Sequence, residues 1–264
     1  MEIPASRWYP VIEKRRSRRS YEHRPLESKD ITRLHSVCSN FKPFLDSRSV
    51  LVTQSPSDVF KGAIGPYGKI RGAPAFIAFI GNMENRNIQE KVGYMGEGII
   101  LEAEAMNLGT CWLALYKSKT VNSLVELDKK EQVLAITAIG YAKQQETIEE
   151  KFLTGFGWTH RRKPLSDLVT GLDESDYPQW MVSALKAARL APSAVNRQPW
   201  RFHVDSKSIT VSVTSLRRGY GSSERLDCGI AMLHIEVAAL NSGIDGSWKF
   251  LEPPNVAKYI VNTN

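Results

Sequence analysis

An internal repeat constrains the fold of this chain more than any other feature of its sequence. The helical stretch EGIILEAEAMNLG, residues 97–109, aligns with AMLHIEVAALNSG, residues 231–243. The matched apolar positions recur at the spacing of one buried helical face. They are Ile99 with Leu233, Ala103 with Val237, and Met106 with Leu240. Asn107 then matches Asn241, and Gly109 matches Gly243.

The elements around these two helices also come in the same order. Each helix follows a proline-started helix and at least one strand candidate, and each precedes a tryptophan, Trp112 or Trp248. A repeated order of elements indicates repeated structural units. We therefore expect two diverged copies of one α+β unit, residues 1–165 and a shortened copy at 166–264.

The remaining pattern predicts mixed, mainly antiparallel sheets flanked by helices. Continuous apolar runs at 73–81 and 133–142 are typical of buried strands. Residues 200–205 alternate between apolar and polar, as a half-buried strand does. Trp8 to Ser20 is predicted to be a helix that ends in a cluster of basic residues. Shorter strands are expected at 49–53, 210–213 and 259–261.

Composition excludes several classes of protein. Apolar residues make up 42% of the 264 residues and charged residues 24%, which is typical of soluble globular proteins. No apolar run approaches the roughly 20 residues that span a bilayer, and the N-terminus lacks the apolar core of a signal peptide. We therefore expect a cytoplasmic protein with no membrane partner. The three cysteines and five histidines are scattered, which indicates neither a metal site nor disulfides.

Two short segments carry the residues that bind ligands best. Residues 14–20, KRRSRRS, place five positive charges in six positions. Such a cluster suits a single phosphate group, whereas a nucleic acid requires a wider basic face. Residues 191–200, APSAVNRQPW, put small and amide side chains between a helix and a strand, a common place for a binding loop. Each segment also has a simpler interpretation, a solvated basic stretch or an ordinary turn.

Together, the two segments resemble the two signatures of the FMN-dependent nitroreductase family. A usual member has the loop about one helix after the basic segment, whereas most of this chain separates them. Family members are generally dimers that hold each FMN between subunits. The resemblance is closest to the tandem branch, in which two copies are fused into an intramolecular pseudo-dimer. Copy one has SNFKPFLD, residues 39–46, in place of the loop, and copy two is acidic around 173–176 where the basic segment belongs. The fused copies would therefore complete one site, and we expect a monomer.

The resemblance also implies which residues hold FMN. The phosphate would be bound by the basic segment and by a late basic residue, namely Arg15, Arg16, Ser17, Arg19 and Arg162. The ring and the ribityl chain would lie along Pro192, Ser193, Ala194, Asn196 and Gln198. Backbone N–H groups near the ring would come from Leu113, Ala114 and Leu115. Arg197 falls outside the pattern and is expected to face solvent.

The activity that the resemblance implies is a ping-pong oxidoreduction. NAD(P)H would reduce FMN, and a nitroaromatic, quinone or other electron-poor acceptor would then take the electrons. No protein residue is expected to act as a nucleophile or metal ligand, because the flavin carries the redox chemistry. Two alternatives remain open from the sequence: a flavin-binding protein without turnover, and a protein that binds anions or nucleic acid through its basic segment.

Overall fold

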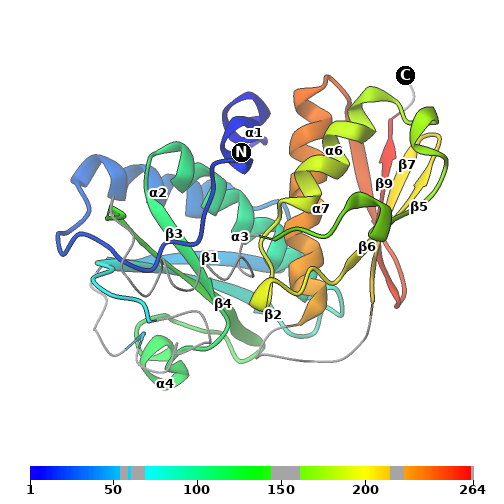
Figure 1. Cartoon of the computed structure of the whole chain (residues 1–264). Helices are drawn as coiled ribbons and strands as arrows, with labels where there is room; N and C mark the ends of the chain where they lie inside the picture. Colours follow the sequence, from blue (N-terminus) through cyan, green and yellow to red (C-terminus); the bar gives the residue numbers. More distant parts are fainter. Residues whose placement is uncertain (54–58, 61–68, 144–160, 215–222, 263–264) are drawn as a thin grey trace.

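Two sheets, each covered by helices, form the part of the chain that this computed structural model describes, residues 1–53, 59–60, 69–143, 161–214 and 223–262 (Figure 1). One sheet has four strands and the other has five. Every strand pair is antiparallel except β5 with β6. The predicted α+β class and the mainly antiparallel sheets are confirmed.

The first unit is built around the four-stranded sheet, in the order β1-β2-β4-β3. Its elements are α1 (Ala5–Ile12), α2 (Ser28–Asn40), β1 (Ser47–Val52), β2 (Ala75–Asn82), α3 (Ile88–Ala105), β3 (Gly109–Leu113), α4 (Ser118–Asn122) and β4 (Glu131–Gly140).

The second unit is built around the five-stranded sheet, in the order β5-β6-β7-β9-β8. Its elements are β5 (Val169–Gly171), α6 (Gln179–Arg189), β6 (Trp200–Asp205), β7 (Ser208–Val213), α7 (Glu224–Asn241), β8 (Gly246–Phe250) and β9 (Asn255–Val261). Short 3-10 turns lie at Leu165–Asp167, Glu174–Asp176 and Ala194–Asn196.

The apolar patterns of the sequence account for the central strands. Strand β2 lies between β1 and β4, and all of its residues except Asn82 are buried, as a continuous apolar run requires. In β6, Trp200, Phe202 and Val204 are buried while the residues between them are more exposed. The alternation predicted for residues 200–205 is therefore confirmed with the predicted bounds.

The two sheets share one order of strands. Along the chain, β1, β2, α3, β3 and β4 correspond to β6, β7, α7, β8 and β9, and the corresponding strands pair in the same antiparallel order. Strand β5 is an addition at the edge of the second sheet. Each unit thus places a long helix between the second and third of the four corresponding strands.

The corresponding helices α3 and α7 meet at the centre of the molecule, where their backbones approach closely. A Cβ atom on Gly93 would lie 2.0 Å from the carbonyl oxygen of Leu226, and a Cβ atom on Gly229 would lie 2.0 Å from that of Glu90. The contact is reciprocal, because each glycine faces the residue three positions before the other glycine. This exchange of equivalent contacts is the geometry of a two-fold interface.

The structure corrects the register of the sequence repeat by two residues. Helix α3 is followed by Asn107 in the left-handed region, with φ 61°, and α7 by Gly243, with φ 74°. After them, the N–H of Leu108 bonds to Ala103 O and the N–H of Ile244 bonds to Ala239 O. Asn107 therefore corresponds to Gly243 and not to Asn241, which is still helical. The helix ends decide the register, since a left-handed cap needs Gly or Asn.

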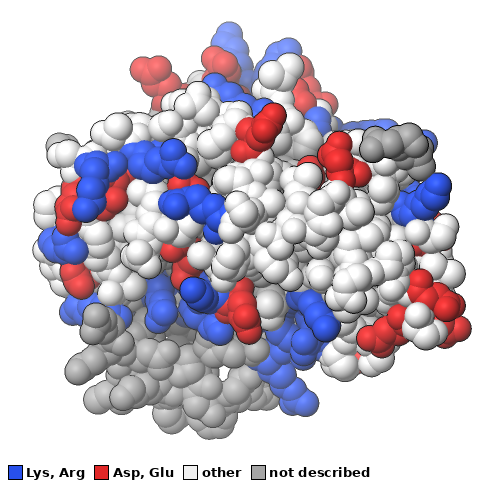
Figure 2. Space-filling model, turned by 90° about the horizontal axis from the view of Figure 1, so that it is seen from above, with Lys and Arg blue, Asp and Glu red and all other residues white. Residues whose placement is uncertain are grey.

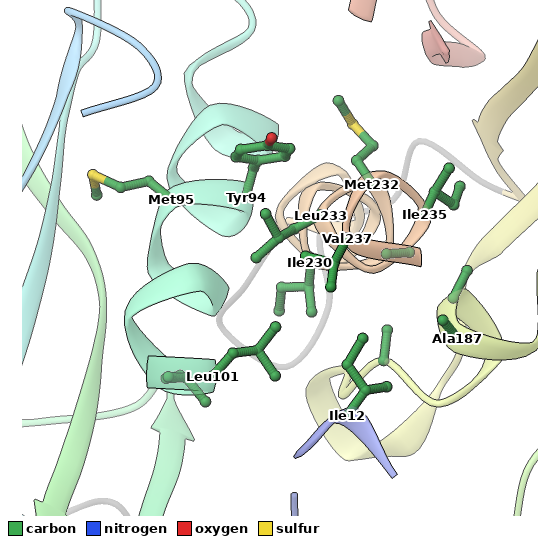
Figure 3. Close-up of a cluster of buried hydrophobic side chains, with 14 of the residues drawn as sticks. Ile12, Tyr94, Met95, Leu101, Ala187, Ile230, Met232, Leu233, Ile235 and Val237 are labelled. Carbon is green, nitrogen blue, oxygen red and sulfur yellow. The ribbon is translucent and has the colours of Figure 1, made fainter. Parts of the chain in front are cut away.

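Figure 3 shows the apolar core between these helices. Ile230, Leu233 and Val237 of α7 lie between Leu101 of α3 and Ile12 of α1, and Ala187 of α6 lies beside α7. These side chains are all almost completely buried. Among the described helices, none combines the length and the apolarity that a membrane crossing requires.

The first helix is shorter than predicted. Helix α1 ends at Ile12, whereas Trp8 to Ser20 was the expected range. The chain then runs beside β3, where Ser17 pairs with Thr110 in parallel and Arg18 N donates to Thr110 O. Because the edge of the sheet bonds this backbone, the segment does not need the hydrogen bonds of a helix. The basic residues consequently lie on an extended segment.

We predict that Gly93→Ala and Gly229→Ala are equally destabilising. Either methyl group would overlap a backbone carbonyl, which cannot move aside as a side chain can, so the unfolding free energy should fall by about 3 kcal/mol. Urea denaturation would measure it. Gly243→Ala is the control, because no atom lies near its Cβ position and only backbone strain of about 1 kcal/mol is added. If either variant lost as little unfolding free energy as Gly243→Ala, then α3 and α7 could move apart at small cost and the prediction would be wrong.

Candidate functional site

Arg15 is the most deeply buried residue of the basic segment. Its side chain is 5% exposed, and its Nε atom lies 3.8 Å from Glu97 Oε1 of α3. Nε has no hydrogen-bond partner among the described residues. A buried Nε–H group without a hydrogen-bond partner is costly, so this arrangement favours an anionic ligand. Arg16 is exposed, and Ser17 and Arg19 are partly buried.

The loop between α6 and β6 has an unusual backbone. Val195, Asn196 and Gln198 have φ values of 48°, 53° and 50°. Three residues other than glycine in the left-handed region, within four positions, indicate a strained segment. Ser193 Oγ helps to hold it by accepting a hydrogen bond from Gln198 N at 2.9 Å.

The two amides of this loop bind the segment at 161–163. Asn196 Oδ1 accepts from Arg162 Nη1 at 2.5 Å, and its Nδ2 donates to Arg161 O at 2.9 Å. Gln198 Oε1 accepts from Lys163 N at 2.8 Å, and its Nε2 donates to Arg161 O at 3.1 Å. The amides predicted to face a flavin thus bond to this segment: Asn196 to the Arg162 side chain, and Gln198 to the backbone on both sides of Arg162.

Arg162 and Arg15 lie in one electrostatic environment. Burial lowers the pKa of Arg162 to about 10, and the charges of Arg15, Arg16 and Arg189 contribute to this shift. Repulsion between charges weakens with distance. Arg15, Arg16 and Arg189 must therefore lie near Arg162 to lower its pKa. Arg162 Nε is also buried without a hydrogen-bond partner in the described part of the chain. Segments far apart in sequence thus bring several positive charges together.

The basic character is local. On the face drawn in Figure 2, lysine and arginine side chains alternate with acidic ones around wide uncharged areas. On that face there is no continuous basic surface of the kind that a nucleic acid needs. This face therefore gives no support to the nucleic-acid alternative.

Asp227 of α7 holds the 191–200 loop in place, and the sequence did not predict this role. It is 2% exposed, accepts from Ala194 N at 3.2 Å, and pairs with Arg197 Nε at 2.7 Å. The expectation that Arg197 faces solvent is wrong, because its side chain is only 12% exposed and is paired with Asp227. An acid within the apolar stretch of α7 was the available signal, since buried acids need partners.

The third predicted contact starts where the basic segment meets β3. Leu113 is the last residue of β3, and Ala114 and Leu115 follow it. Leu113 and Ala114 are partly buried, whereas Leu115 is 49% exposed. Ser17 lies beside Thr110 of the same strand. The contact of these three residues with a ligand stays a prediction.

The corresponding place in the other unit is filled by aromatic side chains. There the connection from α2 to β1 brings Phe44 against Tyr94 and Phe250, with ring centroids 5.3 and 5.6 Å apart. Lys91 Nζ lies 5.5 Å from the centroid of Phe44 and bonds to Asp46 at 2.9 Å. The two units therefore differ here: one has the strained 191–200 loop, and the other has packed aromatic rings.

The described residues offer binding groups but no evident nucleophile or metal site. No cluster of three or more His, Cys, Asp or Glu side chains that could hold a metal is found among them. All three cysteines are free and buried, and burial raises the pKa of Cys38 to about 11, which disfavours the reactive thiolate. The arrangement can bind an anion and align a flat polar ligand.

A family model described as "Putative TM nitroreductase" matches residues 7–239 of the chain. The match includes the basic segment, the 161–163 segment and the loop. No curated protein matches the chain.

Solved structures are similar to this chain, and one of them shares its fold over nearly the whole length. A "putative nitroreductase" from Thermotoga maritima MSB8 superposes with a TM-score of 0.67 and 20% identity, covering 97% of this chain and 94% of its own. An "FMN-dependent Nitroreductase" from Clostridium difficile R20291 has a TM-score of 0.43 and 20% identity, covering 52% of this chain and 88% of its own. A "Putative NADH Oxidase" from Clostridium acetobutylicum has a TM-score of 0.41 and 19% identity, covering 52% and 89%.

We predict that Asp227 makes the stability of the protein depend on pH. Burial raises its pKa from 3.8 to about 6, so the folded protein binds this proton more tightly than the unfolded chain. Its contribution to stability is therefore fully present below about pH 4 and is lost as pH rises through 6, by roughly 3 kcal/mol. Urea denaturation from pH 4 to 8 should show this loss in the natural protein but not in Asp227→Asn. Parallel curves for the two would contradict the prediction.

Proposed function

This chain belongs to the nitroreductase family, and from that membership we propose that it is an FMN-dependent oxidoreductase using NAD(P)H. Its second substrate would be a nitroaromatic, a quinone or a similar electron-poor acceptor. The observation that carries the proposal is the group of arginines that converges beside the 191–200 loop. Arg15 and Arg162 each hold a buried Nε without a hydrogen-bond partner in the described residues, which fits a phosphate monoester.

The chain would contribute binding and orientation. Arg15, Arg16, Ser17, Arg19 and Arg162 would hold the phosphate, with Ser17 as a neutral donor. The small residues Pro192, Ser193 and Ala194 would let the flavin approach the backbone of the loop. Asn196 accepts a hydrogen bond from the side chain of Arg162, and Gln198 bonds to the backbone of the two neighbouring residues, Arg161 and Lys163. Backbone N–H groups at Leu113, Ala114 and Leu115 would complete the site. When bound, FMN would supply the hydride chemistry in a ping-pong cycle.

We further propose that the two units are diverged copies of one ancestral subunit, at about 1–165 and 166–264. The common strand order, the reciprocal Gly93 and Gly229 contacts, and the matching helix ends support this proposal. A dimer-like interface would then lie inside one chain, so the protein would be a monomer. Phe44 and Phe250 occupy the place of the second site, which favours one flavin per chain.

Absorbance spectroscopy tests the function and the stoichiometry together. We expect the purified protein, reconstituted with FMN, to hold one flavin per chain, and NAD(P)H to bleach its visible absorption. Bleaching that reverses when a quinone is added would demonstrate turnover. A bound flavin that NAD(P)H does not bleach would instead support the non-catalytic alternative. Two flavins per chain would contradict the single site.

We predict that Arg15→Gln and Arg162→Gln each lower FMN affinity about tenfold, or roughly 1.4 kcal/mol, with little effect on riboflavin. The reason is that only FMN carries the phosphate. Fluorescence titration of both flavins would measure the ratio of affinities. Arg18→Gln is the matched control. Arg18 belongs to the same basic segment but is not among the proposed phosphate ligands, and it packs against Gly109 near Glu104. Equal losses for FMN and riboflavin would mean that the arginines support structure instead of binding phosphate.

A further inference from the structure

A buried polar network lies directly beneath Arg15. Glu97 of α3 and His234 of α7 are both completely buried, and Glu97 Oε1 lies 3.0 Å from His234 Nε2. Glu97 Oε2 accepts from Trp112 Nε1 at 2.8 Å. His234 Nδ1 lies 2.9 Å from Ala187 O. The network thus joins β3, α3, α7 and α6 under the point where Arg15 enters.

The partners of His234 fix the number of protons that the network holds. A carbonyl oxygen only accepts, so His234 Nδ1 must donate to Ala187 O. If Glu97 were ionised and Nε2 unprotonated, two acceptors would face each other at 3.0 Å without water. A proton must therefore lie between Nε2 and Oε1, whichever atom it is assigned to. The pair of Glu97 and His234 consequently has no net charge.

We propose that Glu97 and His234 form a neutral, proton-sharing pair that positions Arg15 and leaves the full charge of that arginine available to an anionic ligand. An unshared carboxylate 3.8 Å from Arg15 Nε would act as an internal counter-ion and would compete with the ligand. Trp112 and His234 instead occupy both oxygens of Glu97. The identification of the anion as the phosphate of FMN rests on the proposed function.

Other charged groups near Arg15 do not replace this pair. Glu104 lies further along α3, where burial raises its pKa and Arg15, Arg18 and Arg16 oppose that shift. No carboxylate other than Glu97 is within ion-pair distance of Arg15 in the described part of the chain. Arg16 and Arg162 add only positive charge. The charge state of Glu97 therefore governs how strongly Arg15 attracts an anion.

The proposal predicts an unusual rescue. His234→Gln removes the shared proton and exposes Arg15 to an ionised Glu97, so phosphate affinity should fall about tenfold. Glu97→Gln replaces the shared carboxylate with a neutral group of the same shape and should leave that affinity within about twofold. The double variant should recover the affinity of Glu97→Gln. If the pair had only a structural role, Glu97→Gln would lower the affinity as much as His234→Gln does, and the double variant would recover nothing.

The experiment measures binding of inorganic phosphate to the flavin-free protein by calorimetry, and of FMN and riboflavin by fluorescence. Glu236→Gln is the matched control, since this partly buried α7 glutamate also accepts from a tryptophan, Trp248, but has no arginine partner in the described structure. Recovery of phosphate affinity in the double variant confirms the proposal. Equal losses of affinity in His234→Gln, Glu97→Gln and the double variant overturn it, and so does the same loss in Glu236→Gln. Rescue of phosphate binding in a protein that binds no flavin would overturn the proposed function alone. Failure of the natural protein to bind any of the three ligands would overturn the present proposal as well.

Discussion

The close approach of α3 and α7 is the constraint on which the rest of the structure depends. It is possible only because Gly93 and Gly229 leave room for the carbonyl groups of the opposite helix. At this separation the two helices share an apolar core, and a sheet packs on each side of the pair. The same contact lets Glu97 of one helix reach His234 of the other. The two glycines thus allow both the packing of α3 on α7 and the contact of Glu97 with His234.

The candidate site follows from this central contact. The extended segment with Arg15 lies beside β3 of the first unit, whereas the loop with Asn196 belongs to the second. Arg162 bridges them, since it bonds to Asn196 and interacts with the charge of Arg15. The left-handed residues of the loop persist because the loop backbone is held at two points: Asp227 accepts from Ala194 N, and Lys163 Nζ donates to Gln198 O. A site of this kind combines strain with many fixed hydrogen bonds, which is typical of a preorganised binding site.

Local patterns in the sequence predict much of the fold but few of the hydrogen bonds and ion pairs within the candidate site. Periodicity identifies the strand at 200–205 and the buried run of β2, because burial on one or both faces is a local property. The alignment of the two helices expected from the sequence is wrong by two residues. Two similar apolar faces can be aligned in more than one register, whereas the helix ends match in only one. Trp112 with Trp248, and Gly93 with Gly229, carry the correct spacing and could have fixed it.

The basic segment and the loop show what a local pattern leaves out. Their residue types predict an anion and a flat ligand, and the structure brings Arg162 near Arg15. Nothing in the sequence indicates that Arg197 turns inward to Asp227, or that both amides bind the 161–163 backbone. These contacts join residues about 30 or more positions apart, and only the folded chain brings them together.

Phe44, packed against Tyr94 and Phe250, shows a freedom that a single chain has over a symmetric dimer. In a homodimer every substitution appears at both equivalent positions, so a phenylalanine that fills one site fills the other. Here each position occurs once. In the proposed pseudo-dimer, one end of the molecule can be packed for stability, while the other keeps the strained loop and the buried Nε atoms of Arg15 and Arg162 for the proposed ligand. The compromise between stability and activity, which a homodimer must reach within one sequence, is divided here between two halves.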